Sequence, residues 1–520
     1  MAFDPVLPKI LVEEHAASGG HIRAVADAEK DANREKSHRS SQDNADGKPA
    51  RVIPFRRHVP LRHAISLSAS LAIFDVAFIG LALIGWTEVL RERAQVGVAL
   101  ALAVLSAVLS ITFLYAFDAY RSEIAMRFGD LAARALAALC LSGTLLFVFL
   151  WGVIGIVDAA QSAVLAILNV ALSLIGFAAS RAISCALIAG KYFTRRILVV
   201  GSGKRAAHLK ELMGQIPCSL MDELTFVNEA VIGNERGGRP KTDPLLHGDW
   251  ESGPIEELSY ALNIDEIVVA IDDERQVSFE PFLSCKINGI PIVSYGAFIE
   301  REAKRIDLAR SDLPWLVYSG GFRQGFVNAA LKRALDIVVS AVLLFISAPV
   351  MLIAMAAVAS GRDGPVFFKQ QRVTKNGRLF WLYKIRTMRQ DAERNGPQWS
   401  SSSDPRVTYV GAILRRFRID EIPQLVNVLK GEMSLVGPRP EQPYFVEQLS
   451  SEIRFYNLRH TVKAGVTGWA QIHYPYGATK ADAIRKLEYE LYYIKNYSFL
   501  QELSILLQTV RVLFWPPRAN

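Results

Sequence analysis

Long apolar runs alternate with short charged loops over the first third of the chain. They occupy residues 64–86, 96–117, 131–157 and 163–189. As a helix, each run is long enough to cross the hydrocarbon core of a bilayer, which takes about 20 residues. Buried helices of a large soluble protein are the alternative. Four such runs in succession favour an α-helical membrane bundle, predicted for residues 61–190.

Charged residues around these runs indicate the orientation of the bundle. Residues 1–60 are polar, contain few aromatic side chains and are predicted to form a disordered cytoplasmic tail. Basic residues precede the first run, separate the second from the third and follow the fourth: Arg51, Arg56, Arg57, Arg62, Arg121, Arg127, Lys191, Arg195 and Arg196. Arg91 and Arg93, after the first run, are an exception. Because cytoplasmic loops carry an excess of Lys and Arg, both ends of the bundle are expected in the cytoplasm.

Residues 191–300 show another pattern, in which short apolar segments alternate with helical stretches. Strands are expected at residues 197–200, 224–228, 266–271 and 290–293. This alternation predicts a parallel sheet of the doubly wound, Rossmann-like type. The first strand leads into Gly201-Ser202-Gly203, and with Ala206 these glycines fit the dinucleotide-binding fingerprint. A nucleotide phosphate could bind there. A structural or regulatory domain is the alternative, because no clear ribose-binding acid and no Tyr-x-x-x-Lys pair follow.

A fifth apolar run, residues 337–359, differs from the first four. A basic, aromatic linker, residues 301–329, precedes it and is expected either at a membrane interface or in solvent. Pro349 lies near the middle of the run and should kink the helix, and the Ser347 hydroxyl can satisfy a freed backbone group. Basic residues flank both ends. We therefore predict a re-entrant helix, residues 332–360, that enters and leaves on the cytoplasmic side; a kinked spanning helix is the alternative.

Composition agrees with membrane segments attached to globular domains. The 520 residues are 51% hydrophobic and 21% charged, with a net charge of +8. This positive balance suits anionic lipid head groups and phosphorylated substrates, and we expect no nucleic-acid partner. The four cysteines have neither zinc-site nor disulfide spacing, which indicates a reducing compartment. The N-terminus shows no signal-peptide pattern.

Candidate chemistry lies in residues 414–440, LRRFRIDEIPQLVNVLKGEMSLVGPRP. Asp420 and Glu421 are adjacent carboxylates, preceded by Arg415, Arg416 and Arg418. One carboxylate could attack a phosphorus centre while the other holds a divalent cation. The arginines could bind phosphate oxygens. The alternative is a helix N-terminus with acids in its first turn, where the macrodipole favours them.

Several segments after residue 330 match a known family in order. They are KRALDIVVSAVLLFISAPV, GPVFFKQQRVTKNGRLFWLYKIRTM, DPRVTYVGAILRRFRIDEIPQLVNVLKGEMSLVGPRP and KAGVTGWAQI. With them, the chain resembles the bacterial sugar transferases, the monotopic polyprenol-phosphate sugar-1-phosphate transferases. The resemblance implies the long form: a membrane protein with an α-helical bundle, an α/β Rossmann-like domain and a mainly α catalytic domain at residues 330–520. The YPYGATKADAIRKLEYELYYIKN tail resembles an exopolysaccharide subgroup.

The resemblance also implies a chemistry. Asp420 would attack the β-phosphate of a UDP-sugar, with glucose or galactose expected, and release UMP. Undecaprenyl phosphate would then take the sugar phosphate from the aspartate, on the cytoplasmic face of the bacterial inner membrane. Glu421 would help to hold Mg²⁺, and Arg415, Arg439 and Lys384 are candidate phosphate contacts. A homodimer is possible.

Two departures from the family pattern do not touch this chemistry directly. Ala348 stands where many members have serine, and Phe417-Arg418-Ile419 stands where Thr-Ser-Leu is common. Two other functions compete with transfer. One is a catalytically silent membrane module that senses a nucleotide; the other is a transporter. The intact Asp420-Glu421 pair disfavours the first, and the extent of chain after residue 359 disfavours the second.

Overall fold

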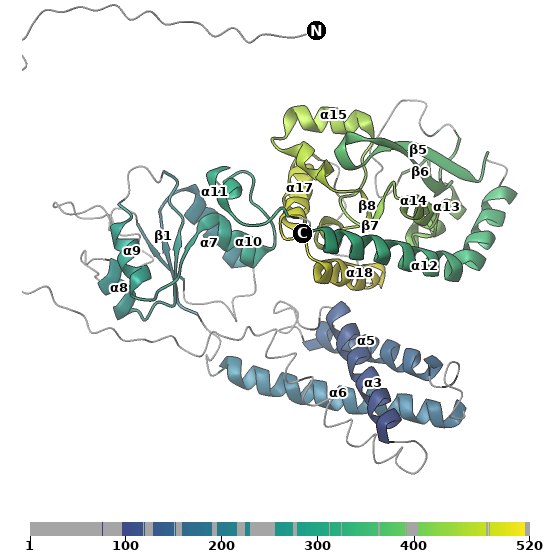
Figure 1. Cartoon of the computed structure of the whole chain (residues 1–520), viewed down its shortest axis with the longest axis horizontal. Coiled ribbons are helices and arrows are strands. Elements are labelled where there is room, and N and C mark those ends of the chain that lie inside the picture. The colour runs from purple at the N-terminus through teal and green to yellow at the C-terminus, as the bar shows by residue number, and fades with distance from the viewer. Residues whose placement is uncertain are drawn as a thin grey trace, which may run out of the picture. The chain divides into compact units, whose positions relative to one another are not determined.

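The computed structural model describes the fold of each part of most of the chain (Figure 1). It describes residues 75, 96–117, 119, 128–149, 151, 159–189, 195–215, 224–228, 255–273, 278–310, 313–323, 325–361, 364–390, 392, 404–474, 477 and 479–514. The predicted tail, residues 1–60, lies outside the described residues, as does nearly all of the first apolar run.

Three of the predicted membrane segments are helices that pack on one another. They are α3 (Val96–Ala116), α5 (Phe128–Val148) and α6 (Ala159–Ala189). Small residues allow the close approach of α5 and α6 that association in a membrane requires. A Cβ added at Gly143 of α5 would lie 2.6 Å from Val170 Cγ2 of α6.

A buried ion pair joins α6 to the first apolar run. Arg181 Nη2 lies 3.1 Å from Asp75 Oδ2, and both side chains are almost fully buried. The same guanidinium lies 4.3 Å from the ring centre of Phe177. Charges are costly within a membrane segment unless they are paired, so this contact fixes Asp75 against α6.

The parallel sheet expected from residues 191–300 is present, with helices on both faces. Its strands are β1 (Ile197–Val200), β2 (Leu224–Val227), β3 (Glu266–Val269) and β4 (Ile292–Ser294), in the order β2-β1-β3-β4. Each pair of neighbouring strands is parallel. Helices α7 (Lys204–Gln215) and α10 (Tyr295–Ala303) bury apolar side chains with one face of the sheet. The opposite face packs with α8 (Ile255–Ala261) and α9 (Glu280–Ile287).

The C-terminal unit is mainly helical, with two small sheets. It begins with α12 (Phe326–Ser360). The short helix α11 (Leu313–Tyr318) lies before it, in the linker. An antiparallel hairpin follows, formed by β5 (Phe367–Val373) and β6 (Leu379–Ile385), with the turn η5 (Lys375–Gly377) between them. The remaining elements are α13 (Tyr409–Arg416), η6 (Ile419–Glu421), α14 (Gln424–Lys430), β7 (Ser434–Val436), α15 (Pro443–Glu452), η7 (Tyr456–Thr461), β8 (Gly465–Thr467), α16 (Trp469–His473), α17 (Lys480–Lys495) and α18 (Phe499–Phe514). β7 and β8 pair in parallel, and Val428, Met433, Leu487 and Leu491 lie in the shared core.

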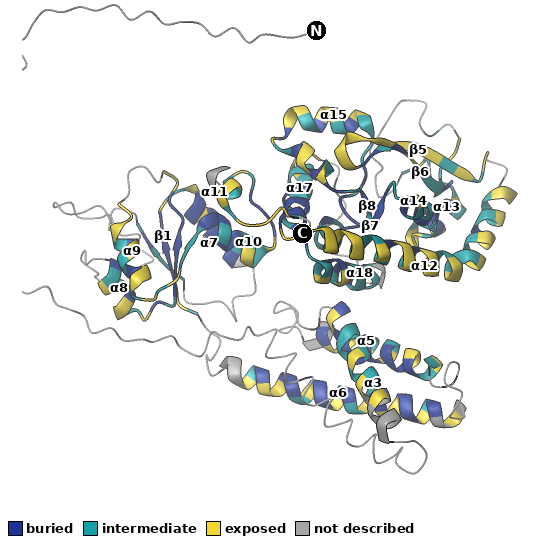
Figure 2. Cartoon of the chain, viewed as in Figure 1, coloured by how far each residue is buried: buried dark blue, intermediate teal, exposed yellow. Residues whose placement is uncertain are grey.

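Helix α12 exposes most of its apolar side chains (Figure 2). Its buried residues are Asp336, Ser340 and Ala354. It is one of three helices in the described residues whose length and composition would allow them to cross a membrane, with segments of α5 and α6. Pro349 lies inside the helix, as expected. The Ser347 hydroxyl donates to the carbonyl of Leu344, at 3.5 Å.

Polar contacts anchor the N-terminal half of α12 to the C-terminal unit. Lys332 Nζ donates to Glu502 of α18 at 2.5 Å and to the Val436 carbonyl of β7 at 3.0 Å. Asp336 accepts hydrogen bonds from the Leu435 amide at 2.9 Å and from the Ser434 hydroxyl at 3.1 Å. The apolar helix therefore begins from a fixed position on the small parallel sheet.

We predict that Asp336→Ala will destabilise the C-terminal unit more than Ser434→Ala does. Removing the carboxylate leaves the buried Leu435 amide without an acceptor, at a cost of about 2 kcal/mol. Removing the Ser434 hydroxyl takes away one bond and leaves that amide satisfied. Thermal unfolding of the detergent-solubilised protein measures the difference. Equal losses in the two variants would contradict the anchoring role of Asp336.

Candidate active site

Asp420 and Glu421 lie on a turn of their own, ahead of α14. The turn η6 follows Arg418, whose φ of 54° lies in the left-handed region and redirects the chain after α13. Helix α14 begins three residues beyond Glu421, at Gln424, so the acids are not in its first turn. At the other end of α14, Arg333 of α12 donates to the carbonyls of Val428 and Leu429, each at 2.7 Å. These contacts tie the position of α14, and the turn before it, to α12.

Glu421 is surrounded by cations. Its carboxylate lies 2.8 Å from Arg439 Nη2, 3.3 Å from Arg418 Nη1 and 3.5 Å from Lys384 Nζ. Burial opposes ionisation, but Arg439, Lys384 and Arg418 more than offset it and hold the pKa of this carboxyl well below its usual range. Glu421 is therefore ionised and held in place.

Asp420 has a different environment, although it is the neighbouring residue. Its side chain is buried, with 7% of the residue exposed. In the part of the chain that the structure describes, no side-chain or backbone donor is hydrogen-bonded to its carboxylate. Burial and the negative charge of Glu421 raise its pKa, while Lys384, Arg415 and Arg439 act in the opposite direction. The result is a carboxylate that lies within a cluster of positive charges and accepts no hydrogen bond from the described residues.

The three predicted phosphate contacts all act on this pair. Lys384 comes from the end of β6, and burial lowers its pKa. Arg415 comes from the last turn of α13 and donates through Nε to Thr387 Oγ1, at 2.9 Å. Arg439 comes from the Gly-Pro-Arg-Pro turn after β7. Arg416 is exposed, and its guanidinium lies 5.9 Å from the ring centre of Phe417.

The Gly-Pro-Arg-Pro turn, residues 437–440, is held tightly from behind. A Cβ added at Gly437 would lie 2.3 Å from the Lys463 carbonyl, so only glycine fits there. Arg459 donates to the Arg439 carbonyl at 2.9 Å. Its guanidinium also binds both carboxylate oxygens of buried Glu490, at 2.9 and 2.8 Å. Arg459 therefore fixes the backbone of a residue whose side chain reaches Glu421, and the sequence motif did not reveal this support.

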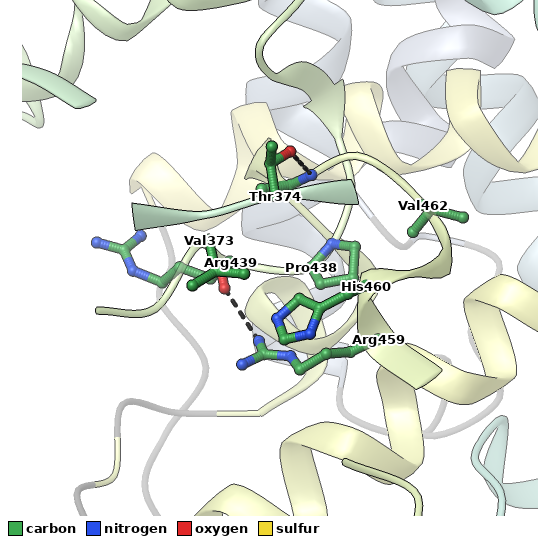
Figure 3. Close-up of a pocket in the computed structure, with 8 residues that line it drawn as sticks. Val373, Thr374, Pro438, Arg439, Arg459, His460 and Val462 are labelled. Atoms are coloured by element: carbon green, nitrogen blue, oxygen red, sulfur yellow. Dashed lines mark hydrogen bonds between the residues drawn. The ribbon is translucent and has the colours of Figure 1, made fainter. Parts of the chain in front are cut away.

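A small open hollow lies beside this turn (Figure 3). Figure 3 shows the Arg439 carbonyl turned toward Arg459, while the Arg439 guanidinium extends away from the hollow. His460 also lines the hollow, and burial together with Arg459 lowers its pKa to about 4. Asp420 and Glu421 do not line this hollow, so the hollow is a feature distinct from the acidic pair.

The glycine turn after β1 is filled by a side chain of the protein itself. Asp272, after β3, accepts hydrogen bonds from the backbone amides of Lys204 and Arg205, at 2.7 and 3.0 Å. A Cβ added at Gly203 would lie 2.4 Å from Asp272 Oδ2. Gly201 has a φ of 142°, and a Cβ there would lie 2.3 Å from the Ala270 carbonyl. Packing against the end of β3 is therefore enough to require both glycines.

Comparison with known proteins identifies the family. Residues 327–516 match the model of the bacterial sugar transferases. The chain is 39% identical over 193 residues to the exopolysaccharide production protein PSS of Rhizobium leguminosarum bv. phaseoli, and covers 95% of that protein and 35% of itself. This chain belongs to the bacterial sugar transferase family.

Two longer matches are to proteins named for transfer to undecaprenyl phosphate. One is a UDP-N-acetylgalactosamine-undecaprenyl-phosphate N-acetylgalactosaminephosphotransferase of Aeromonas hydrophila, 37% identical over 275 residues. That match covers 52% of this chain and 64% of the Aeromonas protein, a little under two thirds of its length. The other is a UDP-glucose:undecaprenyl-phosphate glucose-1-phosphate transferase of Klebsiella pneumoniae, 33% identical over 345 residues, or 62% of this chain and 73% of that protein.

We predict that Asp272→Ala will loosen the first turn of α7. The substitution removes the acceptor for two backbone amides, which costs about 1 kcal/mol at a helix N-terminus. Amide hydrogen exchange at Lys204 and Arg205 should speed up. Asp272→Asn is the matched control: its single amide oxygen can accept from only one of the two backbone amides, so it should keep the protection of one amide and lose that of the other. Unchanged exchange in Asp272→Ala would contradict the capping role.

Proposed function

We propose that the protein transfers a hexose-1-phosphate from a UDP-sugar to undecaprenyl phosphate and releases UMP. The observation that carries this proposal is the contrast within the acidic pair. Glu421 is ionised and bound by three cations, whereas Asp420 is buried beside them and accepts no hydrogen bond in the described part of the chain. Such an arrangement suits one carboxylate that attacks and one that organises charge.

Two displacements at phosphorus account for the transfer. An Asp420 carboxylate oxygen forms a bond to the β-phosphorus of the UDP-sugar, and the bond from that phosphorus to the bridging oxygen breaks. UMP leaves with the electron pair. A phosphate oxygen of undecaprenyl phosphate then attacks the same phosphorus, and the aspartate is released. Dividing the exchange in this way lets the two anionic substrates react one after the other.

Positive charges make the approach of these anions favourable. Arg439 and Lys384 neutralise Glu421 in the structure and lie where a diphosphate would compete for them. Arg415 adds a third cation that favours the ionised form of Asp420. Each can bind phosphate oxygens, and together they can stabilise the charge that develops during displacement.

The residues present are compatible with Mg²⁺. Mg²⁺ is commonly held by one or two carboxylates together with substrate phosphates, rather than by an all-protein cage. Glu421 offers an ionised carboxylate, and the described residues contain no group of three or more His, Cys, Asp or Glu side chains suited to a metal. We propose that Glu421 and the donor diphosphate would hold the ion. Bound there, Mg²⁺ would neutralise charge on the diphosphate and on the leaving UMP.

We further propose that α12 is re-entrant and that the site faces the cytoplasm at the inner membrane. Helix α13 supports this placement. Its Val410 and Leu414 pack with the second half of α12, while Tyr409 and Ile413 are exposed. Phe417, just after the helix, is exposed too, so the three form a stripe suited to the membrane interface. A site at that depth lets a polyprenyl chain stay in lipid while its phosphate reaches Asp420.

We propose that residues 191–300 form a Rossmann-like domain with a structural role. Its sheet order and helices on both faces support the fold assignment. The Asp272 carboxylate at the start of α7 favours the structural alternative over nucleotide binding through Gly201 and Gly203, since a phosphate would have to displace it. The Asp272 contact thereby also weakens the case for a nucleotide-sensing module.

The sugar is proposed to be glucose or galactose. The name of the Klebsiella relative supports glucose, and that of the Aeromonas relative adds N-acetylgalactosamine as a third candidate. Epimeric sugars differ by the position of one hydroxyl, so a few hydrogen bonds decide among them. A panel of these three UDP-sugars, tested for UMP release, separates the candidates.

Asp420→Asn is expected to lower UMP release by at least about a thousandfold, because the amide cannot act as the nucleophile. The assay uses membranes that carry the full chain, with a UDP-sugar and with or without undecaprenyl phosphate. Asp404→Asn is a control at an acid that binds Arg406 and stands outside the pair. Turnover of Asp420→Asn at the wild-type rate would remove Asp420 from the mechanism.

Pro349→Leu is expected to shift part of the protein to a spanning topology. The substitution restores a backbone amide in mid-helix and favours a straight helix long enough to cross the bilayer. The topology is read from a single cysteine introduced at an exposed position, Ser451→Cys. The four native cysteines of the chain are replaced beforehand, so that only this position can react. An impermeant thiol reagent applied to intact cells should label this cysteine only when Pro349 is replaced. Labelling with Pro349 present would contradict the re-entrant arrangement.

A further inference from the structure

Arg415 is held by one edge of its guanidinium. Its Nε donates to Thr387 Oγ1 at 2.9 Å. Within the residues that the structure describes, neither of its terminal NH₂ groups donates to a protein acceptor. The guanidinium therefore has one edge fixed by the hydroxyl and its two terminal nitrogens available for a ligand. A planar fork held in this way is suited to two parallel hydrogen bonds to a phosphate.

Thr387 is itself fixed from several sides. It is buried, two residues past the end of β6. Its carbonyl accepts from the Thr408 amide at 3.0 Å and from the Thr408 hydroxyl at 3.3 Å. Thr408 is the N-cap of α13 and accepts from the Gly411 amide at 3.0 Å. A Cβ added at Gly411 would lie 2.0 Å from the Thr387 carbonyl, so the first turn of α13 lies directly against it.

Both ends of α13 thus depend on one residue. The Thr387 backbone carbonyl holds the start of the helix, and its side-chain hydroxyl holds Arg415 in the last turn. Because a β-branched side chain has restricted χ1 rotamers, few directions are open to the hydroxyl. A substitution that changes only the hydroxyl would leave the backbone contact to Thr408 in place, which makes the two roles separable.

We propose that Thr387 is a positioning residue that aims the Arg415 guanidinium at the diphosphate of the donor. This inference rests on the proposed function for the identity of the substrate. Thr387 touches no reacting atom and acts through Arg415 alone. The KIRTM segment, in which Thr387 follows Lys384 by three residues, therefore serves the site twice: Lys384 contacts Glu421, and Thr387 orients the arginine.

Binding of UDP, the part common to the candidate donors, tests the proposal. Isothermal titration calorimetry on the purified full chain in nanodiscs compares Thr387→Val, Thr387→Ser and Arg415→Ala. Valine keeps the shape of threonine without the hydroxyl, and should weaken UDP binding about tenfold, as expected for a lost hydrogen bond to a charged group. Serine keeps the hydroxyl and should bind within about twofold of wild type.

A double substitution separates positioning from a general structural effect. If Thr387 acts through Arg415, Thr387→Val should change UDP affinity less than about twofold when Arg415→Ala is already present. Thr374→Val is the matched control, because Thr374 is as buried and, among the described residues, its hydroxyl bonds only to backbone, at Glu432 and Ala464. Its effect on UDP affinity should be the same with and without Arg415→Ala.

The outcomes distinguish this inference from the proposed function. An equal loss from Thr387→Val in both backgrounds, or no recovery with Thr387→Ser, would overturn the positioning role. A wild-type protein that binds UDP but releases no UMP from any UDP-sugar would overturn the proposed transfer, while the coupling of Thr387 to Arg415 would still be measured. A wild-type protein that binds no UDP would overturn both.

Discussion

Two neighbouring carboxylates in a largely buried site cannot both be ionised unless cations offset their repulsion and their loss of hydration. This constraint explains why basic side chains from β6, α13, the η6 turn and the turn after β7 meet at one point. Glu421 takes the direct contacts, from Arg439, Arg418 and Lys384. Asp420 accepts no hydrogen bond in the described part of the chain; burial and the charge of Glu421 raise its pKa, and Lys384, Arg415 and Arg439 oppose that shift. The two acids therefore differ in which of them the cations touch, and this difference is what the proposed division of roles rests on.

Holding those cations in position requires contacts from residues outside the acidic pair. Arg459 and Glu490 hold the backbone of Arg439, and Thr387 holds Arg415. Arg333, on α12, fixes the end of α14. Because α12 is also the apolar helix, its position relative to lipid and the position of the acidic pair are mechanically linked. A displacement of α12 would be transmitted to the turn that carries Asp420.

Patterns within short stretches of sequence predicted the helices and strands. The length of the apolar runs predicted α3, α5, α6 and α12, and the alternation of short apolar segments predicted the strands of the parallel sheet. The acidic pair and the cations at Lys384, Arg415 and Arg439 were found from charge type and motif, and the structure brings them together. Asp272, Thr387 and Arg459 were missed because each acts on a residue far away in sequence, through geometry that only the fold creates. A motif alone does not establish a phosphate site. Gly201 and Gly203 fit a phosphate-binding motif, but their close contact with the end of β3 already explains why both are glycine.

A transfer between a water-soluble donor and a lipid acceptor imposes opposite demands on one helix, α12. Near its start α12 must be polar enough to hold the enzyme core, and Lys332, Arg333 and Asp336 do this through contacts to α18, α14 and β7. Farther along it must be apolar enough to remain in lipid, and Phe345, Leu352 and Ile353 are more than 60% exposed there. Pro349 lies within the apolar part, away from the polar anchors. A change of direction at that residue would reorient the second half, which packs with Val410 and Leu414 of α13, while the polar anchors of the first half stay in place. The order of polar anchor, proline and apolar end along α12 is therefore the order that the proposed reaction requires.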